Sequence, residues 1–199
     1  ALLVCIGVSV LYVFPQIQFS QPNLLDVAET WAFGKDIASN ILAEFANSER
    51  FRPLYVFERS FLNTLFFYRS QGYFLFFSFL LASTIYMGFC ILRRSGKSSM
   101  LYTLVGFLFL ISPVTVDTYW RLGTAENLFA LSLVGSIYAL TEKRYTQLLV
   151  WLYVFMGSKG TAIFVVPVFL AFLIYKKRFW EAALLSVGYV GFSIKIYSL

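Results

Sequence analysis

A cation and a carboxylate lie close together in the short segment between two apolar stretches of this chain. Arg121 and Glu126 are five residues apart, between the apolar runs at about 100–114 and 125–140. A charge at the edge of a membrane is costly, so a residue that keeps one there commonly has a function. Arg binds a phosphate through paired hydrogen bonds, and Lys binds it as a point charge. We therefore predict that Arg121 and Lys159, which follows a later apolar run, bind a phosphate group.

Two acids in the long segment before residue 73 are candidates for a general base. A carboxylate near the outer face of a membrane can take the proton from a hydroxyl group as that group attacks. Asp26 is the first candidate for this role and Glu29 is the second. Both acids also fit the polar side of a short amphipathic helix at 23–31, so a solvated helix face remains the alternative interpretation.

Three other charged residues are predicted to support this site. Arg52, in the sequence Phe51-Arg52-Pro53-Leu54, is expected to order the long segment and to contribute to substrate binding. Glu126 is expected to fix Arg121, although the dipole of the helix that it begins explains an acid there equally well. Asp117 is a second candidate for orienting Arg121, or for binding a cation.

The composition excludes several kinds of site. The chain has no histidine, so it has no histidine base, no histidine metal ligand and no Ser-His-Asp triad. Its two cysteines, Cys5 and Cys90, both lie in apolar runs and cannot form a zinc site alone. We therefore expect neither a metal nor a cofactor.

The same composition indicates a polytopic membrane protein. The chain is 59% hydrophobic and 13% charged, with a mean hydropathy of +0.74, whereas about 25% of a typical soluble domain is charged. We predict an all-α fold, a single transmembrane helical bundle over 1–199 that is incomplete at both ends. Its seven apolar segments are 1–14, 73–92, 100–114, 125–140, 147–157, 160–175 and 181–199.

Basic residues predict the orientation of this bundle. Eight of them follow every second apolar segment: Arg93, Arg94, Lys97, Lys143, Arg144, Lys176, Lys177 and Arg178. By the positive-inside rule these loops are cytoplasmic, which places the long loop 15–72 outside the cell. The net charge of +6 is therefore mainly a topology signal. Nucleic-acid binding is not expected, because the basic residues are scattered among short loops.

The long loop 15–72 is predicted to hold helices that lie in the membrane interface. Apolar residues recur every four positions over 33–45, namely Phe33, Ile37, Ile41 and Phe45. Such a pattern is typical of an interfacial helix. A helix is also predicted over 54–68, opened by Pro53 at a tolerated position in its first turn.

Three motifs occur in order along the chain. They are Arg52-Pro53-Leu54, then Ser112-Pro113-Val114 followed by the segment from Arg121 to Glu126, and then Ser158-Lys159-Gly160-Thr161-Ala162. In this order they resemble the Arg-Pro-Leu, the His-Pro-Val with Gly-Arg and an acid, and the Ser-Lys-Glu-Thr-Ala of the GT-C class of glycosyltransferases, membrane enzymes that use polyprenyl-phosphate sugars. The likeness is to O-mannosyltransferases with tetratricopeptide repeats and to their bacterial relatives, and it runs from about residue 20 to 175.

This resemblance implies an enzyme that moves a sugar from a polyprenyl-phosphate donor to an extracytoplasmic hydroxyl group. Its partners would be the lipid-linked donor, the membrane, an acceptor glycan, lipid or protein, and other subunits of a membrane complex. A bacterial inner membrane is favoured over the endoplasmic reticulum. The alternative is a non-catalytic membrane subunit or scaffold with a degenerate fold of this class. It is favoured by two departures, Gly160 in place of an acid and the separation of Asp26 from Glu29.

Overall fold

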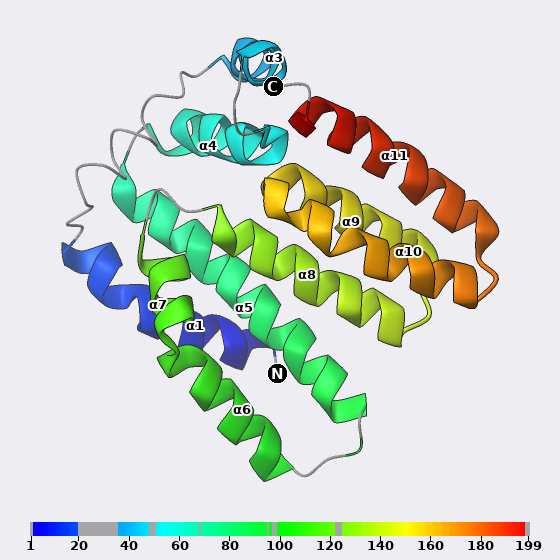
Figure 1. Cartoon of the computed structure of the whole chain (residues 1–199). Helices are drawn as coiled ribbons and strands as arrows, with labels where there is room; N and C mark the ends of the chain where they lie inside the picture. Colours follow the sequence, from blue (N-terminus) through cyan, green and yellow to red (C-terminus); the bar gives the residue numbers. More distant parts are fainter. Residues whose placement is uncertain are drawn as a thin grey trace.

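Helices make up all the regular structure that the computed structural model describes, over residues 2–19, 36–47, 51–67, 69–94, 96, 99–121 and 125–197 (Figure 1). The prediction of an all-α fold is confirmed for these ranges. The elements are α1 (Leu2–Phe19), α3 (Ile37–Asn47), α4 (Pro53–Phe66), α5 (Ser70–Arg94), α6 (Ser99–Ile111), α7 (Pro113–Trp120), α8 (Glu126–Thr141), α9 (Tyr145–Ser158), the 3₁₀ helix η1 (Gly160–Phe164), α10 (Val166–Tyr175) and α11 (Phe179–Tyr197).

The predicted apolar segments correspond to helices, but two of them are divided. The segment 100–114 ends at Ser112, whose side chain accepts a hydrogen bond from the Thr115 amide at 3.2 Å. Pro113 then begins α7, because proline fits the first turn of a helix, where its missing N–H has no partner to lose. The segment 160–175 begins as η1 and continues as α10, which has a proline in its first turn.

The long loop contributes two described helices that pack as a hairpin. The rings of Phe45 in α3 and Phe51 before α4 lie 4.8 Å apart, and Asn40 Nδ2 donates to Ser60 Oγ at 2.9 Å. The predicted helix over 33–45 is confirmed from Ile37 onward, and the predicted helix over 54–68 is α4. The predicted helix at 23–31, with Asp26 and Glu29, lies outside the described residues.

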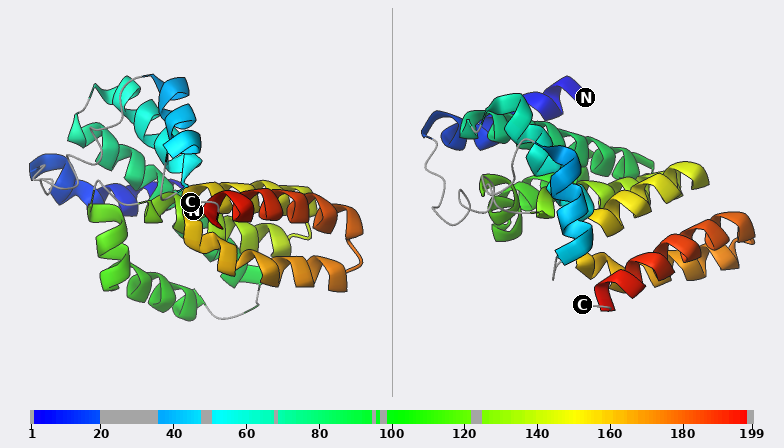
Figure 2. Two further views of the ribbon diagram at one scale, coloured as in Figure 1. Left: turned by 45° about the horizontal axis from the view of Figure 1, so that its top comes forward. Right: turned by 90° about the horizontal axis from the view of Figure 1, so that it is seen from above.

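The longer helices form a stack in which neighbours in space are often distant in sequence. Along it, α1 packs on α5, α5 on α8, α8 on α9, and α9 on α11. Figure 2 shows α10 and α11 as a pair on one side of α8 and α9, with α1 and α5 on the other side. Apolar side chains fill two cores, one around Phe155 and Leu152 of α9, the other around Phe74 and Phe77 of α5.

The two ends of the stack differ in what covers them. The basic turns at Arg93–Arg94, Lys143–Arg144 and Lys176–Arg178 lie together at one end, called here the basic end (Figure 1). There Arg94 Nε lies 2.6 Å from the Glu142 carboxylate, and Arg178 lies 4.4 Å from the ring centre of Tyr145. The hairpin of α3 and α4 lies at the opposite end, called here the capped end.

Two of the described helices have the length and composition of a membrane span. They are α5, with 25 residues and a mean hydropathy of 2.1, and α11, with 19 residues and a mean hydropathy of 1.2. Shorter apolar helices accompany them, over Leu2–Pro15, Glu126–Thr141 and Gly160–Tyr175. A span of the hydrocarbon core needs about 20 residues, so these shorter helices fall below that length.

Candidate functional site

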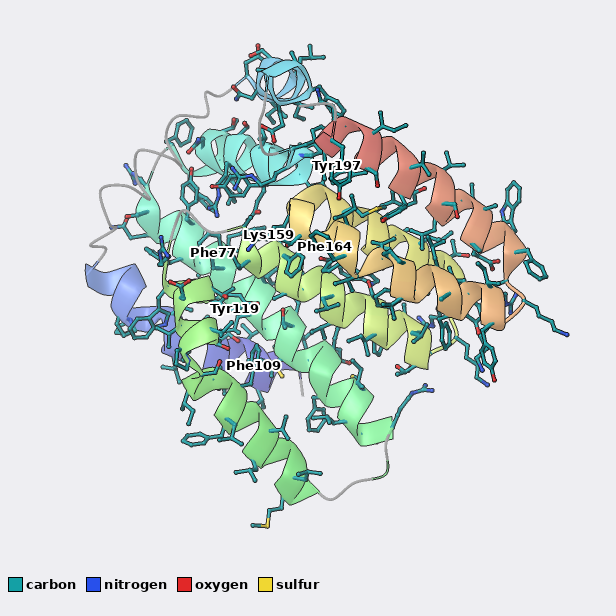
Figure 3. The ribbon with its side chains drawn as sticks, in the orientation of Figure 1. Phe77, Phe109, Tyr119, Lys159, Phe164 and Tyr197 are labelled. Carbon is teal, nitrogen blue, oxygen red and sulfur yellow. The ribbon has the colours of Figure 1, made fainter. Side chains whose placement is uncertain are left out.

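Lys159 and Glu126 form an ion pair at the capped end (Figure 3). Lys159 follows the last residue of α9 in an extended conformation, at the break between α9 and η1. Glu126 is the first residue of α8, where the helix dipole favours an acid. Each side chain is 34% exposed, and the Lys159 ammonium lies 5.9 Å from the ring centre of Phe129. The pair therefore joins two helix ends that are 33 residues apart in sequence.

Arg121 is paired within its own turn. Its guanidinium lies 3.0 Å from the Asp117 carboxylate, four residues earlier, and both side chains are largely exposed. Glu126, expected from the sequence to fix Arg121, pairs with Lys159 instead. Residues 122–124, between Arg121 and α8, lie outside the described ranges. The structure therefore brings Glu126 to Lys159 and Asp117 to Arg121 as two separate pairs.

Arg52 connects the two helices of the hairpin. Its backbone N–H donates to the Glu44 carboxylate of α3, and its guanidinium lies 4.6 Å from the ring centre of Tyr55 in α4. These contacts agree with the expectation that Arg52 orders this part of the long loop. They also place a cation at the edge of the hairpin that covers the capped end.

Arg59, in α4, is a cation in the core of the capped end. It is fully buried, with its guanidinium 5.0 Å from the ring centre of Tyr55 and 5.1 Å from that of Phe77. Tyr55, Arg59 and Leu62 follow the helical period on one face of α4. In the sequence, the burial of Arg59 is indicated only by the position of this cation on the apolar face of the helix.

Glu58, next to Arg59, is the most unusual acid in the described part of the chain. Its side chain is 5% exposed, and neither carboxylate oxygen has a hydrogen-bond partner among the described residues. Burial raises the pKa of the Glu58 carboxyl above its ordinary value, and the nearby charge of Arg59 opposes this rise. Leu54, one turn earlier, packs against Gly157 of α9, so Glu58 lies on the face of α4 turned toward α9.

Two buried donors, one before and one after Arg121 in the sequence, have no hydrogen-bond partner among the described residues. They are Trp120 Nε1 and Asn127 Nδ2, and both are shielded from solvent. Buried N–H groups are nearly always paired in folded proteins. Trp120 packs on Tyr12 of α1, and Asn127 follows Glu126 in the first turn of α8. Both donors could therefore bind a polar ligand near the charged pairs.

An apolar groove lies beside this end, between α9 and α11. It has a volume of about 410 Å³, and the hairpin contributes to it through Phe51 and Leu54. Gly157, Gly188 and Lys195 also line it, and Lys195 is the one cation among the described residues of its walls. The described walls of the groove are otherwise mainly apolar.

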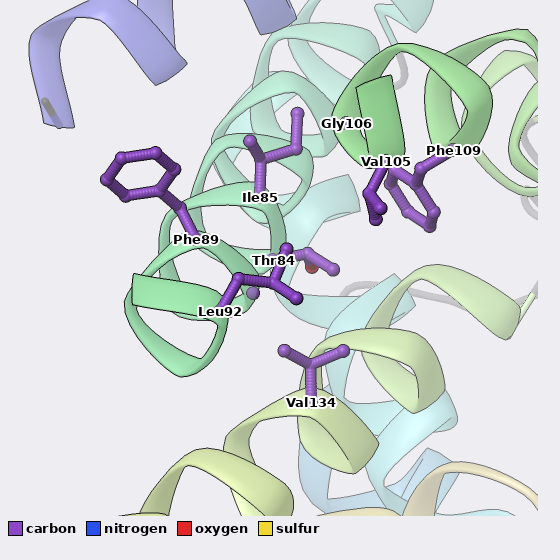
Figure 4. A pocket seen from close by; sticks show the side chains of 9 residues that line it. Thr84, Ile85, Phe89, Leu92, Val105, Gly106, Phe109 and Val134 are labelled. Atoms are coloured by element: carbon purple, nitrogen blue, oxygen red, sulfur yellow. The ribbon is translucent and has the colours of Figure 1, made fainter. Parts of the chain in front are cut away.

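A second apolar pocket, of about 170 Å³, lies between α5, α6 and α8 (Figure 4). Among the described residues no titratable side chain lines it, and its walls include Ile85, Phe89, Val105, Phe109 and Val134. The hydroxyl of Thr84, on its wall, lies 3.2 Å from the Tyr119 hydroxyl. This pocket offers no group for acid–base or phosphate chemistry, so the candidate site is the capped end.

Comparison with known proteins does not identify a family for this chain. Neither a protein-family model, nor a curated protein, nor a solved structure matches the chain. Among the described residues, no group of three or more Cys, Asp or Glu is placed to hold a metal ion. The predicted base, Asp26, and its alternative, Glu29, lie outside the described residues, so the described site consists of cations, their acids and unpaired donors.

Proposed function

We propose that this chain is a multi-pass membrane glycosyltransferase that moves a sugar from a polyprenyl-phosphate donor to an acceptor hydroxyl group on the extracytoplasmic side. The collection of cations at the capped end carries the proposal. Arg52 comes from the hairpin, Arg121 from the end of α7, and Lys159 from the α9–η1 junction. Cations contributed by separate segments suit a phosphate, whose charge grows as it leaves.

The exposed apolar surface supports the membrane placement. Large apolar side chains face outward from helices too short to span alone, such as Phe107 of α6 at 59% exposure and Val168 of α10 at 68%. Exposed large apolar side chains on several helices are typical of a surface that contacts a membrane or a partner. With the spans α5 and α11, these helices form a bundle whose outer surface contacts lipid. The basic end then faces the cytoplasm and the capped end faces outward.

In the proposed reaction, the acceptor oxygen attacks the anomeric carbon of the sugar. The bond from that carbon to the phosphate oxygen breaks, and the phosphate leaves with the electron pair. A carboxylate takes the proton from the acceptor hydroxyl. Lys159 and Arg121 bind the leaving phosphate, and the groove between α9 and α11 takes the start of the lipid chain. Because phosphate is a good leaving group, no acid is needed to protonate it.

The proposal is tested by transfer from a polyprenyl-phosphate sugar, measured with the full chain in membranes. Lys159→Gln should lower turnover about 100-fold, because a charge that binds the leaving phosphate is lost. Arg94→Gln is the matched control, since it removes one paired cation at the basic end. Its turnover should stay within about twofold of wild type. Equal turnover of the two variants would sink the proposed role of Lys159.

The base remains a prediction from the sequence. Asp26→Asn should abolish transfer while donor binding is largely retained, because the change removes the base and keeps its shape. Glu29→Gln is the matched change at the second candidate. If Asp26→Asn turns over as fast as wild type and Glu29→Gln does not, the base is Glu29.

The alternative function, a non-catalytic membrane subunit, is favoured by one observation. Lys159 and Arg121 each have an acid beside them, and a neutralised cation binds phosphate less well. If the wild-type chain transfers no sugar and Lys159→Gln leaves donor binding unchanged, the chain is a scaffold and the ion pairs are structural.

A further inference from the structure

The basic end contains a polar pocket that the proposed reaction does not use. Its volume is about 440 Å³. Residues 143–147 line it from the α8–α9 turn and the first turn of α9, and Arg178 and Glu181 line it from the start of α11. Its lining holds three cations, Lys143, Arg144 and Arg178, and one carboxylate, so positive charge prevails.

Two of the three turns at this end, α8–α9 and α10–α11, have the same construction. Lys143 has a φ of 56° and Lys177 a φ of 58°, a left-handed conformation that usually belongs to glycine at the end of a helix. An arginine follows each lysine: the Arg144 N–H donates to Ala139 O and the Arg178 N–H donates to Leu173 O, both at 2.9 Å. Non-glycine residues held in this conformation often mark functional positions. Here the repetition places a Lys-Arg pair in each turn.

The donors of the pocket come from both turns and are held close together. Arg178 stacks 4.4 Å from the ring centre of Tyr145, which joins the turns, and its Nη1 lies 3.9 Å from the Glu181 carboxylate. The Arg144 side chain accepts no hydrogen bond from the first amides of α9. The N–H groups of residues 145–147 therefore add to the positive potential in the pocket. The start of α11 already has its own acid, Glu181. Guanidinium, ammonium and amide groups together are the donors that bind phosphate.

Aromatic side chains around this end indicate the depth of the pocket. Tyr175, Phe179 and Trp180 are 78%, 65% and 74% exposed, and tyrosine and tryptophan gather at the level of lipid headgroups. We propose that the pocket binds the headgroup phosphate of an anionic phospholipid in the leaflet at the basic end. This inference rests on the membrane placement within the proposed function and does not depend on sugar transfer.

The test compares two triple variants of the full chain that lose the same charge. The pocket variant is Lys143→Gln/Arg144→Gln/Arg178→Gln. The control variant is Arg93→Gln/Lys176→Gln/Lys177→Gln, at the same end but outside the pocket lining. Each variant replaces one lysine that has a left-handed backbone conformation. The two variants are therefore matched in the backbone strain that they alter as well as in the charge that they remove. Binding of phosphatidylglycerol and phosphatidylcholine to the purified chain is measured by native mass spectrometry, with inorganic phosphate as a soluble competitor.

The pocket variant should bind phosphatidylglycerol about tenfold more weakly than wild type, and the control variant less than about threefold. Phosphatidylcholine binding should be unchanged in both. Equal losses in the two variants would show that only the overall charge matters and would overturn the site. Displacement of the lipid by millimolar phosphate would overturn it as well, because the ligand would then be soluble. If the pocket variant does not fold, Arg144→Gln alone, compared with Arg93→Gln, gives the same comparison.

The outcomes for this site and for the proposed function can be told apart. A chain that transfers sugar and shows no preference for phosphatidylglycerol refutes the lipid site only. A chain that binds phosphatidylglycerol through the pocket and transfers no sugar refutes the glycosyltransferase only.

Discussion

The two ends of the helix stack both hold several cations, but they hold them in different ways. At the capped end Arg59 is fully buried between two aromatic rings, and Lys159 is paired with an acid from another helix. At the basic end Lys143 and Arg144 are exposed in their turn. Desolvated charges are costly unless structure fixes them. The two ends therefore differ in the burial of their cations more than in the number of charges.

The largest expected effect comes from removing the buried cation. Arg59→Ala should lower the free energy of unfolding by about 3–5 kcal/mol, because it opens a cavity and leaves Glu58 without its nearby charge. Arg94→Ala, at the basic end, should cost less than about 1 kcal/mol, because its side chain is exposed. Thermal unfolding in one detergent measures both. Similar losses would mean that the two ends do not differ in the way described.

The next effect depends on pH and concerns Glu58. Burial raises the folded pKa of this carboxyl above its unfolded value of 4.5. Below pH 4.5 the acid is neutral in both states, and as the pH rises the unfolded state loses its proton first, so stability falls. Glu58→Gln should therefore unfold at a higher temperature than wild type at pH 7, and this gain should vanish below pH 4.5. A constant gain across that range would show that Glu58 is not the titrating group.

A smaller effect should separate two turns of the basic end. Lys143→Gly and Lys177→Gly each remove a side chain from a residue with a left-handed backbone conformation. The free energy of unfolding should rise by about 0.5–1 kcal/mol, after subtraction of the conformational entropy that glycine adds to the unfolded chain. Both should raise the unfolding temperature by similar amounts. Only Lys143→Gly should weaken phosphatidylglycerol binding, since Lys177 does not line the pocket. Weaker phosphatidylglycerol binding in both variants would mean that the lipid contacts the whole basic end and not the pocket alone.

The smallest effect compares two ion pairs at the capped end. A double-mutant cycle on Asp117 and Arg121 should give a coupling energy of about 0.3–0.5 kcal/mol, as for exposed pairs four residues apart on a helix. The same cycle on Glu126 and Lys159 should give a larger value, because that pair is less exposed and joins two helices. Equal coupling energies would remove the distinction between the two pairs.

The sequence predicts the helices well and their pairing poorly. Hydrophobic runs depend on residues close in sequence, so each of the seven predicted apolar segments falls on a described helix, whereas the predicted helix at 23–31 lies outside the described residues. The division at Ser112 was missed because proline is accepted in the first turn of a new helix without breaking the apolar pattern. The unwound start at Gly160 was missed for a similar reason, since its residues remain apolar.

The candidate site could be predicted only in part, because its contacts join residues that are far apart in the sequence. The Arg121 and Lys159 cations could be named from their places next to apolar runs, but the partner of Lys159 is 33 residues away and depends on how α8 packs on α9. Glu126 was assigned to Arg121 because that cation is near it in sequence. The burial of Arg59 could not be predicted from the sequence, because it depends on the packing of the hairpin, which buries one face of α4 against α5 and α9.

The division of the chain at Ser112 and Pro113 has a consequence for biogenesis. At about 1.5 Å per residue, the 13 residues of α6 extend about 20 Å, which is less than the hydrocarbon core of about 30 Å. The 16 residues of α8 reach about 24 Å. Under the proposed membrane placement, neither helix is long enough to cross the bilayer alone during synthesis. That placement predicts that α5, which has the length of a span, enters first, and that α6 to α9 enter together after it.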